Sequence, residues 1–432
     1  MKDKESSRRQ FLKGGAALAV AGLAVGPIGS ASGQTLESTR PIGLGTGKVL
    51  PYGVPSRFAT AKHAHRDPED SGGGRYLSLR GKGSAETPLE DLTGIITPSG
   101  LHFVLFHGAD PPDIDPRQHR LLIQGMVERP LILTMEEVRR LPFVSRICFI
   151  ECGGNGTYTR SPERPGVQNP KTAGEAFGGT SCSEWTGVLL PLLLQEVGVQ
   201  KGASWVVAEG AEAGWTMSIP LEMIGETLVA YGQNGEDVRP EQGFPLRLVA
   251  PGMSGDHWVK WLRRIVVTSQ PVMSIRDSIE AGLRKDGRSR LFKPQMPVKS
   301  VITFPSGGQQ LPVRGFYEIS GIAWSGGGRI RRVEVSTDGG RTYKDAQLQE
   351  PVLPKAWTRF CFPWNWDGAE AIIQSRTTDE QGEVQLTVAE MARVWGATVE
   401  EWKVSLTTPT LFNPIQPWRV DRDGSVHNAL FS

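Results

Sequence analysis

The sequence predicts two folded domains in series, an α+β domain followed by an antiparallel β-sandwich of the immunoglobulin type. Three observations support this prediction. The chain has 432 residues, more than one ordinary domain of roughly 150–200 residues requires. Helical and strand-like segments alternate up to about residue 292, whereas short strands separated by turns follow. The 52 glycines, 31 prolines and 12 tryptophans are typical of turn-rich β structure.

In the first domain, local patterns assign the elements. Thr134 and Glu137 form a capping box that opens a short helix through Arg140. A second helix is expected over residues 188–197, closed by Gly198. The expected strands cover residues 121–125, 144–151, 205–209 and 245–250.

The second domain shows strand spacing with no helices between, as in an immunoglobulin-like sandwich. Asp338-Gly-Gly-Arg341 predicts a hairpin turn. The expected strands cover residues 300–304, 316–324, 330–336, 357–362 and 371–377. The chain is therefore divided into a signal peptide at 1–31, an extended N-terminal arm at 32–95, a first domain at 96–294 and a second domain at 295–432.

The N-terminus reads as a twin-arginine export signal. Residues 7–13 are Ser-Arg-Arg-Gln-Phe-Leu-Lys, and an apolar run at 14–25 and small residues at 29–31 follow. The alternative is an amphipathic anchor helix, but the run is too short and too glycine-rich to span a bilayer, so no stable membrane anchor is expected. Because this route exports folded proteins, the signal predicts a periplasmic protein that receives a complex cofactor before export.

The net charge argues against a nucleic-acid partner. The full chain carries +2, but residues 1–31 contain five basic and two acidic side chains, so the mature charge is −1. A nucleic-acid binder would carry a strongly basic face, and none is expected here.

Cys152 is the leading candidate for chemistry. It follows the strand at 144–151 and precedes Gly-Gly-Asn155, a setting that suits a soft metal or a covalent intermediate. A buried structural cysteine is the alternative, and Cys148 would share its face of the strand. The four cysteines form no Cys-x-x-Cys motif, so neither a zinc ribbon nor haem is expected in this chain.

Two cations flank a Pro-Gly turn further along the chain. Arg247 and Lys260 could present fixed positive charge to a phosphate, although an ordinary surface pair is the alternative. His107 ends an apolar run, where a satisfied core histidine is the commoner outcome.

Taken together, these motifs resemble the sulfite oxidase family of molybdenum–molybdopterin enzymes, and within it the molybdenum subunits of the sulfane dehydrogenases of the thiosulfate-oxidising Sox system. The resemblance runs from about Tyr52 to the C-terminus. The motifs that carry it, in order, are Tyr52-Gly-Val-Pro-Ser, Gly94-Ile-Ile-Thr-Pro-Ser-Gly-Leu101, Cys152-Gly-Gly-Asn155, Gly243-Phe-Pro-Leu-Arg247, Val259-Lys260-Trp261-Leu262, Ala323-Trp-Ser-Gly-Gly-Gly328 and Asn413-Pro-Ile-Gln-Pro-Trp-Arg419.

The resemblance implies a molybdopterin-binding catalytic domain followed by a dimerisation domain. It implies one molybdenum, held by the dithiolene of a single pterin and by Cys152, with Arg247 and Lys260 holding the pterin phosphate. Cofactor contacts are implied at Phe106, His107, Asn155, Glu212, Gln242, Arg247, Trp258, Val259 and Lys260.

The chain departs from sulfite oxidases at several substrate-binding positions. Leu105 stands where they carry an arginine, Gln242 replaces a histidine, and Gly156-Thr157 replaces two arginines. Residues 271–290 contain no counterpart of an active-site tyrosine. Each lost charge-assisted contact is worth about 1.5–3 kcal/mol, so free sulfite is not expected to be the preferred substrate. Arg160 or Arg164 could supply part of the missing charge.

The function expected is periplasmic, molybdenum-dependent oxidation of sulfane sulfur or sulfite. The implied electron acceptor is a c-type cytochrome subunit or a soluble cytochrome c. A sulfur-carrier protein is a further candidate partner, and a homodimer or heterotetramer is expected. The alternatives are a sulfoxide-type reductase of the same fold and a non-catalytic periplasmic module that has lost its substrate pocket.

Overall fold

The computed structural model covers most of the chain after residue 84. The described residues are 64–65, 85–105, 111–156, 171–211, 215–272, 274, 294–394, 396–400 and 412–430. The signal and most of the predicted arm lie outside them. The described end of the arm contributes β2 (Ala85–Glu86), which pairs with β1 (Ala64–His65).

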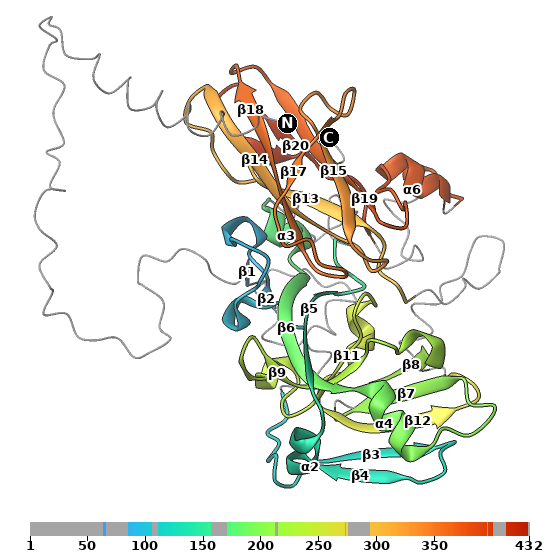
Figure 1. The fold of residues 1–432 in the computed structure, drawn as a ribbon. Helices are drawn as coiled ribbons and strands as arrows, with labels where there is room; N and C mark the ends of the chain where they lie inside the picture. The colour runs from blue at the N-terminus through green and yellow to red at the C-terminus, as the bar shows by residue number, and fades with distance from the viewer. Residues whose placement is uncertain are drawn as a thin grey trace, which may run out of the picture. The chain divides into compact units, whose positions relative to one another are not determined.

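Two sheets build the first domain (Figure 1). The first has the order β4-β3-β12-β7-β8, antiparallel except for the parallel pair of β3 and β12. The second has the antiparallel order β10-β9-β6-β5, and β11 also pairs with β9. The strands are β3 (Arg120–Gly125), β4 (Leu131–Thr134), β5 (Val144–Glu151), β6 (Thr180–Leu189), β7 (Trp205–Gly210), β8 (Thr216–Pro220), β9 (Leu228–Gln233), β10 (Glu236–Asp237), β11 (Arg247–Val249) and β12 (Leu262–Thr268).

The helices in the described part of this domain are short. The capping box is confirmed at α2 (Met135–Arg140), where the Thr134 hydroxyl accepts from the Glu137 amide at 3.2 Å. A similar box opens α3 (Ala173–Phe177). Single 3-10 turns occupy Leu89–Asp91, Ser99–Leu101, Leu221–Met223, Pro240–Gln242 and Gly255–His257. Within the described residues, no helix has the length and apolar character needed to cross a membrane.

The helix predicted over residues 188–197 begins two residues later than expected, as α4 (Leu190–Val197). Val188 and Leu189 end β6 instead, opposite Val229 and Leu228. The prediction was wrong there because a continuous apolar run has no period that separates a buried strand from a buried helix.

Two antiparallel sheets form the second domain, as an immunoglobulin-like sandwich requires (Figure 1). The orders are β13-β14-β18-β17 and β16-β15-β19-β20-β21. The predicted hairpin joins β15 to β16, with Gly339 and Gly340 at φ +75° and +86°. The strands are β13 (Lys299–Phe304), β14 (Gly315–Trp324), β15 (Ile330–Ser336), β16 (Lys344–Asp345), β17 (Gln347–Leu348), β18 (Thr358–Trp366), β19 (Ala371–Asp379), β20 (Pro417–Val420) and β21 (Val426–Asn428).

The helix α6 (Val388–Val394) interrupts this all-strand pattern and was not predicted. The Glu390 amide donates to the Thr387 hydroxyl at 3.2 Å, and the Glu390 carboxylate accepts from the Thr387 amide at 2.8 Å. The sequence pattern Thr-x-x-Glu is typical of such a capping box, so the start of this helix could have been predicted.

Strand β5 contributes to two hydrophobic cores. Cys148 and Ile150 pack in the core of the first domain, whereas Phe149 packs with the buried residues of the sandwich. This alternation follows from the two-residue repeat of a strand. It places the residues after β5 where both cores meet.

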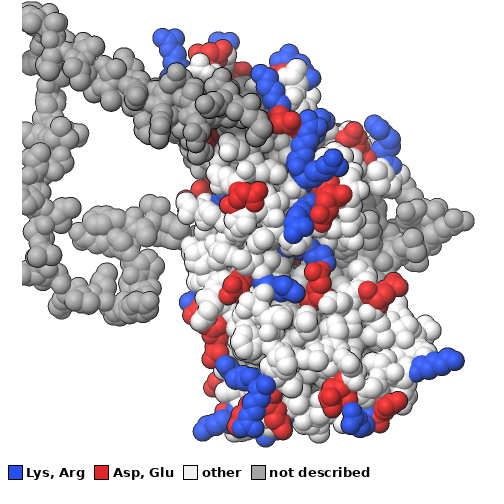
Figure 2. Space-filling view, in the orientation of Figure 1, with Lys and Arg blue, Asp and Glu red and all other residues white. Residues whose placement is uncertain are grey.

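Charges of both signs are interspersed on the face drawn in Figure 2. Many form exposed ion pairs, such as Arg129 with Glu196 and Arg139 with Asp237. Exposed pairs of this kind contribute about 0–1 kcal/mol each, so the stability of the fold rests on its cores.

Candidate active site

The backbone around Cys152 is fixed at the end of β5. The Cys152 amide donates to the Gly179 carbonyl at 2.8 Å, and the Cys152 carbonyl accepts from the Asn155 amide at 2.9 Å. Gly255 packs directly against this point, because a Cβ on it would lie 2.9 Å from the Glu151 carbonyl oxygen. Cys152 is half-buried, and its side chain lines a pocket in the first domain.

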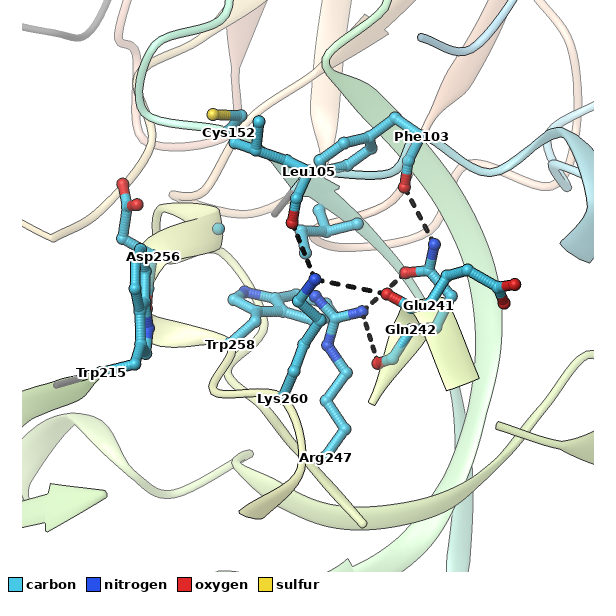
Figure 3. A pocket seen from close by; sticks show the side chains of 12 residues that line it. Phe103, Leu105, Cys152, Trp215, Glu241, Gln242, Arg247, Asp256, Trp258 and Lys260 are labelled. Carbon is cyan, nitrogen blue, oxygen red and sulfur yellow. Dashed lines mark hydrogen bonds between the residues drawn. The ribbon is translucent and has the colours of Figure 1, made fainter. Parts of the chain in front are cut away.

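That pocket gathers residues from segments far apart in the sequence (Figure 3). Five of the residues predicted for the site line it together: Cys152, Gln242, Arg247, Trp258 and Lys260. Seven further lining residues were not predicted as site residues: Phe103, Leu105, Ile150, Trp215, Glu241, Gly255 and Asp256. Most of these are sequence neighbours of the motifs, so proximity along the chain could have suggested them. Trp215 is an exception, because it directly precedes β8, away from those motifs.

Arg247 is a buried cation beneath this pocket. Its residue is 4% exposed, and its Nη1 donates to the carbonyl and side-chain oxygens of Gln242 at 3.0 and 2.8 Å. Its guanidinium lies over the rings of Trp185 and Trp258, 5.2 and 5.8 Å from their centroids. Burial lowers the pKa of Arg247 to about 9, so the group remains charged at neutral pH.

Among the described residues no carboxylate pairs with Arg247, and its buried Nε has no hydrogen-bond partner. An unpaired buried charge is costly, and a bound anion would offset that cost. Gln242 is itself held, because its Nε2 donates to the Phe103 carbonyl at 2.9 Å. Arg247 and Gln242 therefore form a rigid, positively charged part of the pocket wall.

Lys260 approaches the pocket from a turn that two glycines make possible. A Cβ on Gly210 would lie 2.3 Å from the Lys260 carbonyl oxygen, and one on Gly243 would lie 3.0 Å from the Lys260 Cα. The next residue, Trp261, has φ +50°. The Lys260 ammonium donates to the Leu105 carbonyl at 2.7 Å, which ties the segment around Leu105 to this turn (Figure 3).

The pocket also carries two carboxylates, those of Glu241 and Asp256, beside the two cations. Trp215 stands next to Asp256 and donates through Nε1 to its carbonyl at 3.2 Å. Leu105, Phe103 and Ile150 supply an apolar wall. The described part of the pocket therefore carries charges of both signs.

Other predicted site residues have different surroundings. Asn155 donates to the Glu151 carboxylate at 2.9 Å and accepts from the Gly179 amide at 3.1 Å, outside the pocket lining. Val259 is fully buried in the first core. Several predicted residues lie outside the described residues: Phe106, His107, Arg160, Arg164 and Glu212.

These side chains fit a molybdenum–pterin cofactor. No group of three or more His, Cys, Asp or Glu residues that could hold a metal ion occurs in the described part of the chain. A metal here would therefore depend on the Cys152 thiolate and on ligands brought by an organic cofactor. A thiolate suits a soft metal, and the uncompensated Arg247 suits an anionic group.

Comparison with known proteins gives the same class. An oxidoreductase molybdopterin-binding domain matches residues 107–275, and a molybdenum-cofactor oxidoreductase dimerisation domain matches residues 290–406. A twin-arginine signal matches residues 5–25, so the periplasmic localisation predicted from the sequence is confirmed. These matches define a molybdopterin-dependent oxidoreductase, and the predicted fold class is confirmed.

The solved structure of the sulfane dehydrogenase SoxCD from Paracoccus pantotrophus is 34% identical, with a TM-score of 0.82 over 93% of this chain and 100% of that chain. The chain therefore belongs to the sulfite oxidase family of molybdenum enzymes. NADH nitrate reductases of Phaseolus vulgaris and Arabidopsis thaliana are 35% and 34% identical over 66% and 67% of the chain. The aligned part is 35% of the length of each of these two relatives.

Proposed function

We propose that this periplasmic molybdenum oxidoreductase oxidises a sulfur substrate, sulfane sulfur or sulfite, and passes the electrons to a c-type cytochrome. The observation that carries the proposal is the meeting of the Cys152 side chain and the buried Arg247 cation in one pocket. Similarity to a sulfane dehydrogenase along that whole chain supports a sulfur substrate.

In this proposal Cys152 ligates the metal, and Arg247, Gln242, Lys260 and Trp258 bind the single pterin. The cofactor, when bound, supplies a centre that exchanges an oxygen atom and stores electrons. Arg247 holds the anionic part of the pterin by charge, and Gln242 fixes the direction of the guanidinium. Further contacts are proposed for Phe106, His107, Asn155, Glu212 and Val259.

The electron balance defines the partner. Transfer of one oxygen atom from water to sulfur releases two protons and two electrons, and a cytochrome accepts electrons singly. We therefore propose a c-type cytochrome subunit or a soluble cytochrome as acceptor, with a sulfur-carrier protein as one form of substrate. The matched dimerisation domain supports a homodimer or heterotetramer. The boundary proposed between the catalytic and dimerisation domains is residues 294–295.

A reductase is the second candidate, because nitrate reductases are among the relatives. The Glu241 and Asp256 carboxylates and the apolar Leu105 disfavour small free anions in the described part of the pocket, nitrate and free sulfite alike, so within the proposal they favour sulfane sulfur over sulfite. A sulfoxide reductase would escape this argument, since its substrate is neutral. A non-catalytic module would contain no molybdenum.

The experiment combines metal analysis with a substrate panel. Purified wild-type protein is expected to contain molybdenum and pterin, and to reduce cytochrome c with a persulfide, thiosulfate or sulfite. Cys152→Ser should lose this activity, whereas Cys361→Ser, a cysteine of β18, should retain it. Nitrate or sulfoxide reduction with a reduced viologen, without sulfur oxidation, would overturn the proposal in favour of a reductase. Metal-free wild-type protein would favour a non-catalytic module.

A further inference from the structure

A buried ion pair joins the second domain to the residue next to Cys152. The Lys299 ammonium on β13 lies 3.0 Å from the Glu151 carboxylate at the end of β5. Their side chains are 0% and 3% exposed. The two residues are 148 positions apart in the chain, so this contact exists only in the folded protein.

Both oxygens of Glu151 have buried donors. Oε1 accepts from Lys299 and from Asn155 Nδ2, the latter at 2.9 Å. Oε2 accepts from Trp324 Nε1 at 2.7 Å. Two of these three donors, Lys299 and Trp324, belong to the second domain.

Lys299 is equally constrained. Its ammonium also donates to the Phe412 carbonyl at 2.9 Å and lies 4.3 Å from the centroid of the Phe177 ring. A buried pair of this kind offers little net stability compared with an apolar pair of the same volume. Its main effect is on geometry, because the hydrogen bonds hold both charged side chains in fixed directions.

That geometry reaches the proposed metal ligand through the strand. Glu151, the last residue of β5, is anchored in the second domain, whereas Cys152, which directly follows it, packs against the core of the first domain. Because neighbouring residues at a strand end face opposite sides, anchoring Glu151 directs Cys152 toward the pocket. Asn155 closes the loop, since it contacts Glu151 and accepts from the Gly179 amide at 3.1 Å, while the Gly179 carbonyl accepts from the Cys152 amide.

We propose that Lys299, Glu151 and Trp324 are positioning residues, through which the second domain sets the direction of the Cys152 thiolate toward the metal. This inference rests on the proposed function, because it assumes that Cys152 ligates molybdenum. It assigns the second domain a role in the metal site in addition to dimerisation.

The test compares purified holoenzymes. Lys299→Met removes the cation and leaves the Glu151 carboxylate buried with two neutral donors. We expect at least a tenfold lower kcat with KM changed less than twofold, less molybdenum per chain, and altered g-values in the Mo(V) electron paramagnetic resonance spectrum. Trp324→Phe removes one hydrogen bond, keeps an aromatic ring, and should shift the same spectrum less, so it remains informative if Lys299→Met does not fold.

Glu226→Gln is the matched control. It removes an ion pair with Lys355 of the second domain but leaves Glu151 and its donors in place. We expect a wild-type spectrum and wild-type molybdenum content. The proposal is overturned if folded Lys299→Met or Trp324→Phe has lower thermal stability but wild-type g-values and kcat. The proposed function fails separately if the wild-type protein contains no molybdenum.

Discussion

Arg247 Nη1 lies 2.8 Å from the side-chain oxygen of Gln242, and this neutral amide is its partner where a buried arginine would ordinarily have a carboxylate. Sulfite oxidases, which the sequence resembles, carry a histidine at the position of Gln242. The neutral amide leaves the positive charge of Arg247 available to a ligand.

Replacing Arg247 by Met should weaken cofactor retention and stabilise the empty protein. A charge-assisted contact is worth about 1.5–3 kcal/mol, so the fraction of chains that retain pterin after dialysis should fall about tenfold or more. The thermal midpoint of cofactor-free protein should rise, because an unpaired buried cation is removed. Pterin fluorescence and thermal scans measure the two effects. Arg129→Met, at an exposed ion pair, should change neither, and wild-type retention in Arg247→Met would contradict the assignment.

Gly243→Ala should disturb the Lys260 turn. Gly243 has φ +113°, and an added Cβ would lie 3.0 Å from the Lys260 Cα. We expect a loss of stability of about 1–2 kcal/mol from the backbone conformation, together with lower molybdenum content. Gly235→Ala is the control, because Gly235 has φ +79° but nothing within 4 Å of the added Cβ. If both variants lose stability and neither loses molybdenum, the turn does not position a cofactor-binding residue.

Leu105→Arg should improve the use of free sulfite. The Leu105 side chain lines the pocket at a position where sulfite oxidases carry an arginine. One added charge-assisted contact should lower the KM for sulfite about tenfold. Leu105→Met, which lengthens the side chain without charge, should leave this KM unchanged. Steady-state assays with cytochrome c give the comparison, and equal KM values for the two variants would refute the explanation from lost charge.

His119 should make stability depend on pH. Its Nε2 donates to the Leu262 carbonyl at 2.9 Å, and burial lowers the pKa of its imidazole below the ordinary value of 6.5. The folded state then binds a proton less readily than the unfolded state. Stability from this group is therefore complete above pH 6.5 and is lost as the pH falls through the lowered pKa. Denaturation at a series of pH values should show a shallower slope for His119→Gln, and an unchanged slope would exclude His119 as the source.

Much of the fold was predictable, because its signals are local. The Thr134 cap, the strand over residues 144–151 and the turn at 338–341 depend on neighbouring residues alone. The end of β6 was not predictable, because Val188 is placed by pairing with Val229 and not by its own neighbours.

The candidate site was likewise only partly predictable from the sequence. Motifs identified Cys152, Gln242, Arg247, Trp258 and Lys260, which line one pocket. The motifs gave no sign that Glu241 and Asp256 add negative charge to it, since neither belongs to a spacing that implies such a role. The contact of Glu151 with Lys299 could not be predicted either, because it depends on how the second domain packs against β5.

The most direct test of the central claim is X-ray absorption at the molybdenum edge, measured on wild-type protein, Cys152→Ser and Cys361→Ser. If Cys152 ligates molybdenum, the Cys152→Ser spectrum should show one sulfur neighbour fewer than the wild-type spectrum, and Cys361→Ser should match the wild type. A wild-type spectrum from Cys152→Ser, with molybdenum still bound, would contradict the account.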